Sequence, residues 1–413
     1  MTCVHLLIPM RYVINKFFIL IFLSLPICTY AAEEAKIKII KKQILASGFM
    51  PVRLLYQNPD ENLAKIGKII FASKGLSLFG GMSCRTCHLD KFGSADGIPN
   101  AAAIRGHGKG VKRLLSGAKQ VPRNTLALWG NGSKGFNIFF WDGKIDFSTT
   151  KKISQFGKQA PSSDPLLTTV HLPVVEIREM LDENEFIRKY KVESVKKSKI
   201  VYQEITKNLI KTEPKAGAML ANALGKDINS LEYIDIARSI ASFIRTEFRL
   251  KPTKLEKFME GEATLNKKEL DGALTFYGKG GCATCHSGPH FSDFKFYTIA
   301  FPQLGFGKNG FGVDYGRYNV TFNPKDLYKF RTPSLYNVEK TAPYGHSGSA
   351  RTLEEAVIAH YDPLKIIDLR KLDALERHEF YKRLTLNDAS NKVNFLTLDE
   401  VKSLVLFLKT LSF

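Results

Sequence analysis

Two pentapeptides decide how this chain is interpreted: Cys84-Arg85-Thr86-Cys87-His88 and Cys282-Ala283-Thr284-Cys285-His286. Both have the pattern C-x-x-C-H, which is typical of the attachment of a c-type haem. Two thiols a helical turn apart can each bond to one vinyl group of the same porphyrin, and the histidine that follows can bind the iron from one side. The sequence therefore predicts two covalently bound haem c groups, held by Cys84, Cys87 and His88 and by Cys282, Cys285 and His286.

Two other sites can be built from C-x-x-C pairs. One pair can form a thioredoxin-like dithiol, and two pairs can form a four-cysteine zinc site. Both alternatives leave unexplained why a histidine follows each pair. The chain has six cysteines, and Cys3 and Cys28 fall in a predicted leader. No disulfide framework therefore competes with the haem interpretation.

The N-terminus has the pattern of a secretory signal peptide. Arg11 and Lys16 precede or open an apolar run from Phe17 to Ile27, and Thr29-Tyr30-Ala31 offers small residues for cleavage after Ala31. The run is shorter than the about 17–25 residues of a spanning helix. An uncleaved anchor and a lipoprotein site at Cys28 are the alternatives. Because bacteria attach c-type haems outside the cytoplasm, we expect a signal peptide over residues 1–31 and a periplasmic protein.

The chain is strongly basic, with a formal net charge of +20, and 44% of its residues are apolar. Such a charge is typical of nucleic-acid-binding proteins. An exported protein rarely meets nucleic acid, however, and the lysines are dispersed, so we expect no nucleic-acid partner. The charge instead suits the docking of an acidic electron donor or of an anionic membrane surface, or it is a solvated surface without a partner.

The chain repeats one arrangement. The stretches 63–71 and 270–277 have apolar residues at helical spacing and precede the two haem motifs. Helices are also expected over 234–248 and after the capping box that Thr397 and Glu400 form. The sequence predicts a mainly α fold with two cytochrome-c-like haem domains, at 32–252 and 253–413, and with long Gly/Pro-rich loops at 90–160 and 287–330.

Further motifs follow in order along the chain: Arg123-Asn124-Thr125, Phe140-Trp141-Asp142-Gly143-Lys144, Glu179-Met180, Gly288-Pro289-His290-Phe291-Ser292-Asp293, Asp314-Tyr315-Gly316-Arg317, Phe330-Arg331-Thr332-Pro333-Ser334-Leu335-Tyr336-Asn337 and Thr341-Ala342-Pro343-Tyr344-Gly345-His346-Ser347-Gly348. Their order around two haem motifs resembles the bacterial di-haem cytochrome c peroxidases and their MauG-like relatives over most of residues 55–413. Leu126 stands where the family's R-N-T-P motif has proline.

The resemblance implies that the haem on His88 binds peroxide and that the haem on His286 stores or relays electrons. It makes Trp141 a relay between the haems, unless it is an ordinary buried tryptophan at a domain interface. A base that moves a proton between the peroxide oxygens is needed, and the resemblance assigns this role to Glu179. It also implies that Gln155 lines the same pocket and that His107, in a glycine-rich loop, caps the iron in a resting state or only frames the pocket.

Similarly, the resemblance implies a calcium ion at Asn124, Thr341 and Pro343. The family's second ligand to the C-terminal haem is a methionine fourteen positions after the histidine at His346. That position here is His360, followed by Tyr361, and the last methionine of the chain is Met259. We therefore expect His360 as the ligand, with Tyr361 as the alternative. Methionine raises the potential of a His-ligated haem and imidazole does not.

We expect a periplasmic peroxidase that reduces hydrogen peroxide to water with electrons from a small donor protein, a cytochrome c or a cupredoxin. The alternatives are a MauG-like oxidase that modifies a protein and a di-haem electron carrier without catalysis. A homodimer, common among relatives, is left open. His346 is expected to have a structural role. His171, His290 and His378 are expected on the surface or in loops, without a role.

Overall fold

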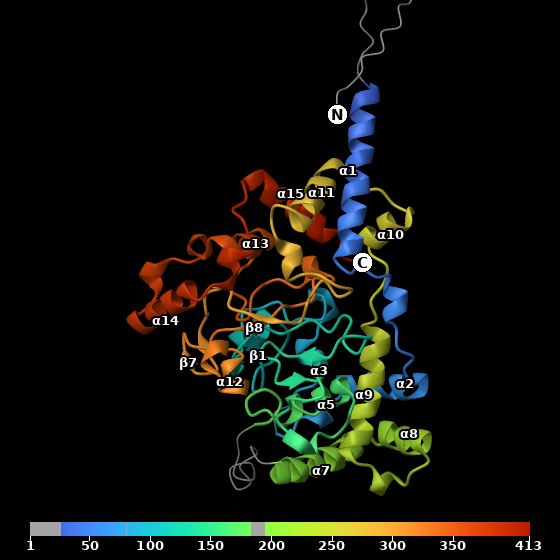
Figure 1. Ribbon diagram of the computed structural model, residues 1–413. Helices are drawn as coiled ribbons and strands as arrows, with labels where there is room; N and C mark the ends of the chain where they lie inside the picture. Colours follow the sequence, from blue (N-terminus) through green and yellow to red (C-terminus); the bar gives the residue numbers. More distant parts are fainter. Residues whose placement is uncertain (1–25, 80, 183–194) are drawn as a thin grey trace, which may run out of the picture. The chain divides into compact units, whose positions relative to one another are not determined.

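The computed structural model describes residues 26–79, 81–182 and 195–413 (Figure 1). The chain divides into two units, 1–39 and 40–413, and both haem motifs lie in the second. Most of the predicted signal peptide falls on residues 1–25, outside the described residues, and Pro26–Ala46 form helix α1. Among the described helices, none combines the length and the apolar character needed to cross a bilayer.

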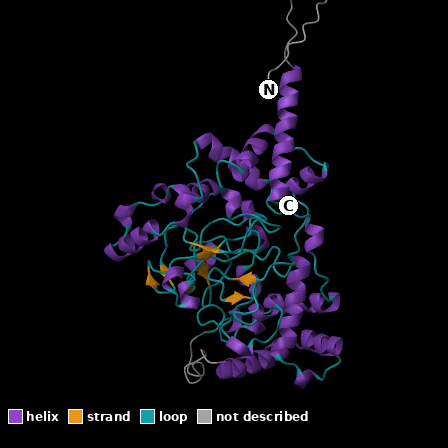
Figure 2. Cartoon of the chain, viewed as in Figure 1, coloured by secondary structure: helices purple, strands orange, loops and turns teal. Residues whose placement is uncertain are grey.

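Helices dominate, and each strand has only two residues (Figure 2). The remaining helices are α2(Glu61–Ala72), α3(Cys84–Cys87), α4(Val111–Leu115), α5(Pro165–Val170), α7(Val195–Thr212), α8(Pro214–Leu224), α9(Tyr233–Glu247), α10(Lys254–Glu260), α11(Lys267–Tyr277), α12(Tyr318–Thr321), α13(Leu353–Tyr361), α14(Ala374–Thr385) and α15(Leu398–Lys409). The strands pair antiparallel as β1(Ala101–Ala102) with β2(Gln120–Val121), β3(Ile138–Phe139) with β4(Ile145–Asp146), β5(Phe296–Tyr297) with β8(Phe330–Arg331), and β6(Phe306–Gly307) with β7(Gly310–Phe311). The predicted mainly α class is confirmed.

The largest cluster of buried apolar side chains surrounds the first haem motif. It draws on α2, α7, α8 and α9, on Ile145 of β4 and on loop residues such as Phe136 and Met180, and both Cys84 and Cys87 pack against it. A smaller cluster, formed by Phe301, Ala350, Ala356 and Ala359, lies at α13. Long loops can stay ordered here because their apolar side chains join these cores.

Each haem motif follows a helix that crosses a later helix at a glycine. A Cβ on Gly67 of α2 would lie 1.9 Å from the carbonyl oxygen of Ser239 in α9. A Cβ on Gly272 of α11 would lie 2.0 Å from the carbonyl oxygen of Ser403 in α15. Side chains cannot approach backbone so closely, so both crossings depend on glycine. The same contact therefore recurs in the two halves, as the repeat in the sequence suggested.

The variants Gly67→Ala and Gly272→Ala are expected to lower the free energy of unfolding by about 1–3 kcal/mol, because the added methyl group forces two packed helices apart. Denaturant unfolding followed by far-ultraviolet circular dichroism measures the effect. Gly217→Ala in α8 is the matched control, since its Cβ would meet nothing closer than 3.4 Å and alanine favours the helix. Equal effects at all three glycines would contradict the crossing argument.

Candidate active site

The first haem motif forms the short helix α3, which presents Cys84 and Cys87 on successive turns. The amide of His88 donates to the carbonyl of Cys84 over 2.9 Å and closes that turn. The His88 ring donates from Nδ1 to the carbonyl of Ser94 over 2.8 Å. Burial lowers the pKa of His88 to about 4, so the ring is neutral at pH 7. Its Nε2 is left as the metal-binding nitrogen, oriented by the carbonyl behind it.

The second motif repeats this arrangement. Cys282–Thr284 form a 3-10 turn, and the His286 ring donates from Nδ1 to the carbonyl of Phe291 over 3.0 Å. Burial lowers the pKa of His286 to about 4. Neutral imidazole is the form that binds iron. Both motif histidines are therefore neutral, and each has its Nδ1 bonded to a carbonyl of the loop that follows the motif.

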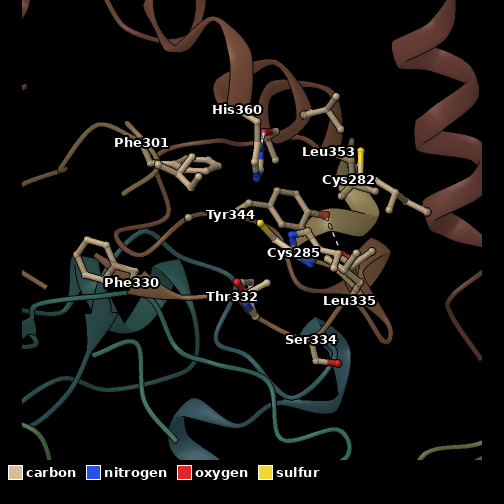
Figure 3. A pocket seen from close by; sticks show the side chains of 18 of the residues that line it. Cys282, Cys285, Phe301, Phe330, Thr332, Ser334, Leu335, Tyr344, Leu353 and His360 are labelled. Carbon is tan, nitrogen blue, oxygen red and sulfur yellow. Dashed lines mark hydrogen bonds between the residues drawn. The ribbon is translucent and has the colours of Figure 1, made fainter. Parts of the chain in front are cut away.

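His360 projects from α13 into the pocket that holds Cys282 and Cys285 (Figure 3). Its Nδ1 donates to the carbonyl of Ala356 over 2.8 Å, and burial lowers its pKa. The centroids of the His286 and His360 rings are 6.4 Å apart. An iron about 2 Å from a nitrogen of each ring, with a ring radius of roughly 1.2 Å, requires about this separation. The residues present therefore fit a haem held between two imidazoles.

Most of this pocket is apolar, which suits a porphyrin. Its lining includes Ile299, Phe301, Phe330, Leu335, Tyr336, Tyr344, Leu353, Val357, Leu396, Leu404 and Leu408. Tyr361, the alternative ligand, lies elsewhere: its ring packs on Phe395, and its hydroxyl donates to the carbonyl of Leu396 over 3.5 Å. Of the two candidates, the structure brings only His360 next to His286, and its role as ligand stays a prediction.

His360→Ala is expected to remove the low-spin spectrum of the second haem, because one axial ligand is lost. His360→Met is expected to raise the reduction potential of that haem, on the order of 100 mV, because thioether favours the reduced iron. Spectroelectrochemical titration measures both. Tyr361→Phe is the control and should change neither. An unchanged low-spin spectrum in His360→Ala would show that the ligand is another residue.

Glu179 lies in a tight turn beside the first motif. The amides of Glu179, Met180 and Leu181 all donate to the carbonyl of Glu176, over 3.2–3.3 Å. A β-bridge between Phe79 and Leu181 anchors the turn to the segment that precedes α3. Burial raises the pKa of the Cys84 and Cys87 thiols, and the Glu179 carboxylate raises both further. The carboxylate is thus within electrostatic reach of both sulfurs.

The environment of Glu179 favours its protonated form. The side chain is half-buried, and burial, followed by the neighbouring charge of Glu176, raises its pKa to about 7. Lys144 and Lys308 oppose this shift without reversing it. At neutral pH the carboxyl group is therefore divided between an acid and a base, as a group that shuttles protons requires.

Two residues predicted at this pocket are not brought to Glu179. Gln155 is exposed on a turn, whereas its neighbour Phe156 is buried. His107 is exposed, and its backbone exchanges hydrogen bonds with the Ser116 hydroxyl. The loops of His107 and Glu179 are nevertheless joined, because two nitrogens of Arg105 donate to the carboxylate of Asp182, over 2.8–3.2 Å.

Trp141 lines the second pocket and is half-buried, and its Nε1 donates to the carbonyl of Asn124 over 2.9 Å. The preceding Phe140 packs against the first core, so this segment touches both halves. The side chain of Asn124 donates to the carbonyl of Pro343 over 2.6 Å, and its buried Oδ1 has no hydrogen-bond partner among the described residues. Thr341 lines the same pocket. Amide and carbonyl oxygens are ligands that calcium accepts, so these residues fit the predicted ion.

The sequence did not reveal why so many motifs carry charges. Arg123 is 8% exposed and pairs with two fully buried carboxylates, Asp142 at 2.5 Å and Asp314 at 2.8 Å. Arg317 pairs with Asp146 at 3.0 Å. Three motifs distant in sequence are thus locked together through buried ion pairs. Four of these five residues belong to the sequence motifs, and Asp146 lies two positions after one of them. Spacing along the sequence alone does not show which of these charges pair.

His171 and His290 lie in turns, one of the two predicted alternatives, but neither is on the surface. His171 is 3% exposed and donates to the carbonyl of Leu167, and His290 is 2% exposed and contacts the carbonyl of Lys134. Both are buried because aromatic rings pack around them. His378 is exposed, and His346 is buried in a stack with Phe330. No three His, Cys, Asp or Glu side chains within 26–79, 81–182 and 195–413 form a metal-binding group.

Comparison with known proteins shows which family and which fold the chain resembles. Residues 61–264 match the family described as di-haem cytochrome c peroxidase. The chain is 28% identical to cytochrome-c peroxidase IdrP1 of Pseudomonas sp. (strain SCT), over 76% of this chain and 75% of that protein. It is 26% identical to methylamine utilization protein MauG of Methylorubrum extorquens, over 72% and 67%. The diheme peroxidase BthA from Burkholderia thailandensis superposes with a TM-score of 0.63 at 19% identity, over 88% of this chain and 89% of that one.

Proposed function

Because the chain belongs to the family of di-haem cytochrome c peroxidases and MauG-like oxidoreductases, we propose that it is a periplasmic peroxidase. It reduces hydrogen peroxide to two water molecules with two electrons and two protons. The electrons come from a small donor protein, a cytochrome c or a cupredoxin, for which the net charge of +20 favours an acidic docking face. We assign the peroxide-cleaving haem to residues 32–252 and the electron-storing haem to residues 253–413.

The observation that carries the proposal is the position of Glu179 beside the first motif, with a pKa of about 7. Covalently bound haem, when present, supplies the open iron position for peroxide and the store of electrons. His88 and His286 each offer an oriented Nε2 to it. The ionised Glu179 accepts the proton of the peroxide oxygen nearer the iron and returns it to the oxygen that leaves as water.

Other residues would support the electron path and the junction of the two halves. Trp141 lies on the second pocket, and the adjoining Phe140 packs in the first core, so this segment suits a relay. Asn124, Thr341 and Pro343 would hold calcium between the halves. His360 would be the second ligand of the electron-storing haem. Gln155 and His107 would act only after their loops move toward the pocket.

A second candidate function is a MauG-like oxidase that uses peroxide to modify another protein. One observation favours it: the second pocket offers the imidazole of His360 to the iron, and its lining contains no methionine. Methionine would raise the potential of the second haem. Without methionine, the transfer of electrons from ordinary donors to the second haem is less favourable. Oxidation of a protein partner is then correspondingly more favourable.

Steady-state kinetics of the purified holoprotein test the proposal. Peroxide consumption matched by two oxidised donor molecules per peroxide is the expected result with reduced cytochrome c. Peroxide consumption that depends instead on a partner protein, with a covalent change in that partner, supports the MauG-like function. A protein that binds neither peroxide nor cyanide in any redox state is an electron carrier, and the proposal then fails.

A further inference from the structure

An ion pair lies beside Glu179, with its lysine buried and the side chain of its glutamate 31% exposed. Lys144 is 7% exposed, and its Nζ lies 2.5 Å from Oε1 of Glu176. Burial disfavours both charges, but each partner holds the other ionised: Lys144 lowers the pKa of Glu176, and Glu176 raises that of Lys144. Removing an ammonium group from water costs several kcal/mol, and a buried pair is weak evidence for stability alone. Stability alone therefore does not explain this ion pair, and a second role has to be considered.

Glu176 and Glu179 belong to one turn. The Glu176 carbonyl accepts the amide of Glu179 over 3.2 Å, and two more amides of the turn donate to the same oxygen. Between them, Arg178 has a φ of 72°, a left-handed conformation that costs free energy for a residue other than glycine. A turn with this geometry needs support from outside. The ion pair to Lys144 supplies it, because it holds the side chain of Glu176 in place.

Lys144 comes from a different part of the site. Its amide donates to Oδ1 of Asp142 over 3.1 Å, and its ammonium group lies 4.4 Å from the centre of the Phe140 ring. Both neighbours belong to the segment that contains Trp141. Lys144 thus connects the segment at the junction of the two halves to the turn that carries Glu179.

We propose that Lys144 and Glu176 are positioning residues for Glu179: their ion pair holds the turn with the Glu179 carboxyl directed at the first haem motif, and it keeps one negative and one positive charge beside that carboxyl. This inference rests on one part of the proposed function, the role of Glu179 as a base beside the first haem motif. In this proposal neither Lys144 nor Glu176 touches the peroxide.

The charges around Glu179 come from four elements. Glu176 is on its own turn, Lys144 follows the segment of Trp141, Lys308 lies in the loop between β6 and β7, and Cys84 and Cys87 are on α3, where haem attachment would remove their charge. Lys308 is held 3.7 Å from Asp142. Burial makes the largest contribution to the raised pKa of Glu179, and the charge of Glu176 makes the second largest. Lys144 and Lys308 lower this pKa, and Lys144 has the larger effect of the two.

Two single variants should therefore move the pH profile in opposite directions. Loss of the negative charge in Glu176→Gln lets Glu179 ionise more easily, so the fall of kcat/KM on the acid side should move down by roughly one pH unit. Loss of the positive charge in Lys144→Met should move that fall up by a similar amount. Lys144→Arg should restore the wild-type profile, and the double variant should lie between the two single ones.

A purely structural role would lower activity without separating the two profiles, and shifts in the same direction, or no shifts, would overturn the inference. Lys254→Met is the matched control, because it breaks an ion pair with Glu269, 2.7 Å long, far from Glu179 in sequence and outside the site. It should leave the profile unchanged. The absorbance spectrum of the haems shows whether each variant has folded.

A second readout separates this inference from the proposed function. Hydrogen cyanide loses its proton when it binds to a haem, so a base in the pocket makes its binding rate depend on pH. The same opposite shifts are expected in the rate of cyanide binding, which requires no turnover. If the wild-type protein lacks peroxidase activity but the cyanide profiles shift as stated, the proposed function fails and the inference stands. If peroxidase activity is present and neither profile shifts, the inference fails.

Discussion

Glu179→Gln is expected to lower kcat for peroxide about 10²–10⁴-fold, the range typical of a lost general acid–base group. Glutamine has the shape of glutamate but accepts no proton at neutral pH, so peroxide can enter while its proton has no acceptor. The haem spectrum should be unchanged, because Glu179 is not an iron ligand in the proposal. Stopped-flow and steady-state kinetics measure the change.

The pH dependence of kcat/KM tests the role of Glu179 independently of the loss in kcat. Glu179 must be ionised to accept the first proton, and its pKa is raised to about 7 by burial and by Glu176. In the wild-type protein kcat/KM should therefore fall as the pH falls through about 7, and this limb should be absent from Glu179→Gln. Glu204→Gln, at an exposed residue paired with Lys207, is the control. Activity of Glu179→Gln within a few-fold of wild type would remove Glu179 from the mechanism.

Arg123→Met is expected to lower the free energy of unfolding by about 3–5 kcal/mol, because it leaves buried carboxylates without their partner. Asp142 and Asp314 are both fully buried, and Arg123 donates to Asp314 through two nitrogens, over 2.8 and 2.9 Å. Burial, the largest single effect, would raise the pKa of these carboxyls, but the neighbouring charges and hydrogen bonds, with Arg123 first among them, together lower both. Denaturant unfolding measures the loss.

The cause is tested by removing the orphaned charges. Adding Asp142→Asn and Asp314→Asn to Arg123→Met should recover part of the stability, because neutral amides cost less to bury. Lys207→Met, which breaks an exposed pair with Glu204, should change stability by less than about 1 kcal/mol. If the triple variant is no more stable than Arg123→Met, the loss comes from packing rather than from unpaired charge.

Local sequence patterns were sufficient to predict several of the helices. The helices expected over 63–71 and 270–277 lie within α2 and α11, the one expected over 234–248 matches α9 to within one residue at each end, and α15 begins with the capping box of Thr397 and Glu400. Such elements follow from helical periodicity and side-chain caps, which depend only on neighbours in sequence. The two C-x-x-C-H motifs could be recognised for the same reason, because their chemistry is complete within five residues.

Burial and pairing needed the tertiary structure. The rings of Tyr202 and Tyr233 that pack on His171 are distant from it in sequence, and so is the ring of Phe136 that packs on His290. Gln155 fits a motif but lies on an exposed turn. Lys144 and Glu176 are thirty-two residues apart, so their contact, and its proximity to Glu179, could not be derived from spacing.

By itself the sequence determined the mainly α class, the helices that precede the haem motifs and the composition of each motif, since these depend on short-range geometry. The tertiary structure alone decided that the centroids of the His286 and His360 rings lie 6.4 Å apart and that Arg123 joins Asp142 to Asp314. Contacts of that kind arise when distant segments pack, and the charge of a buried group depends on all the segments that surround it.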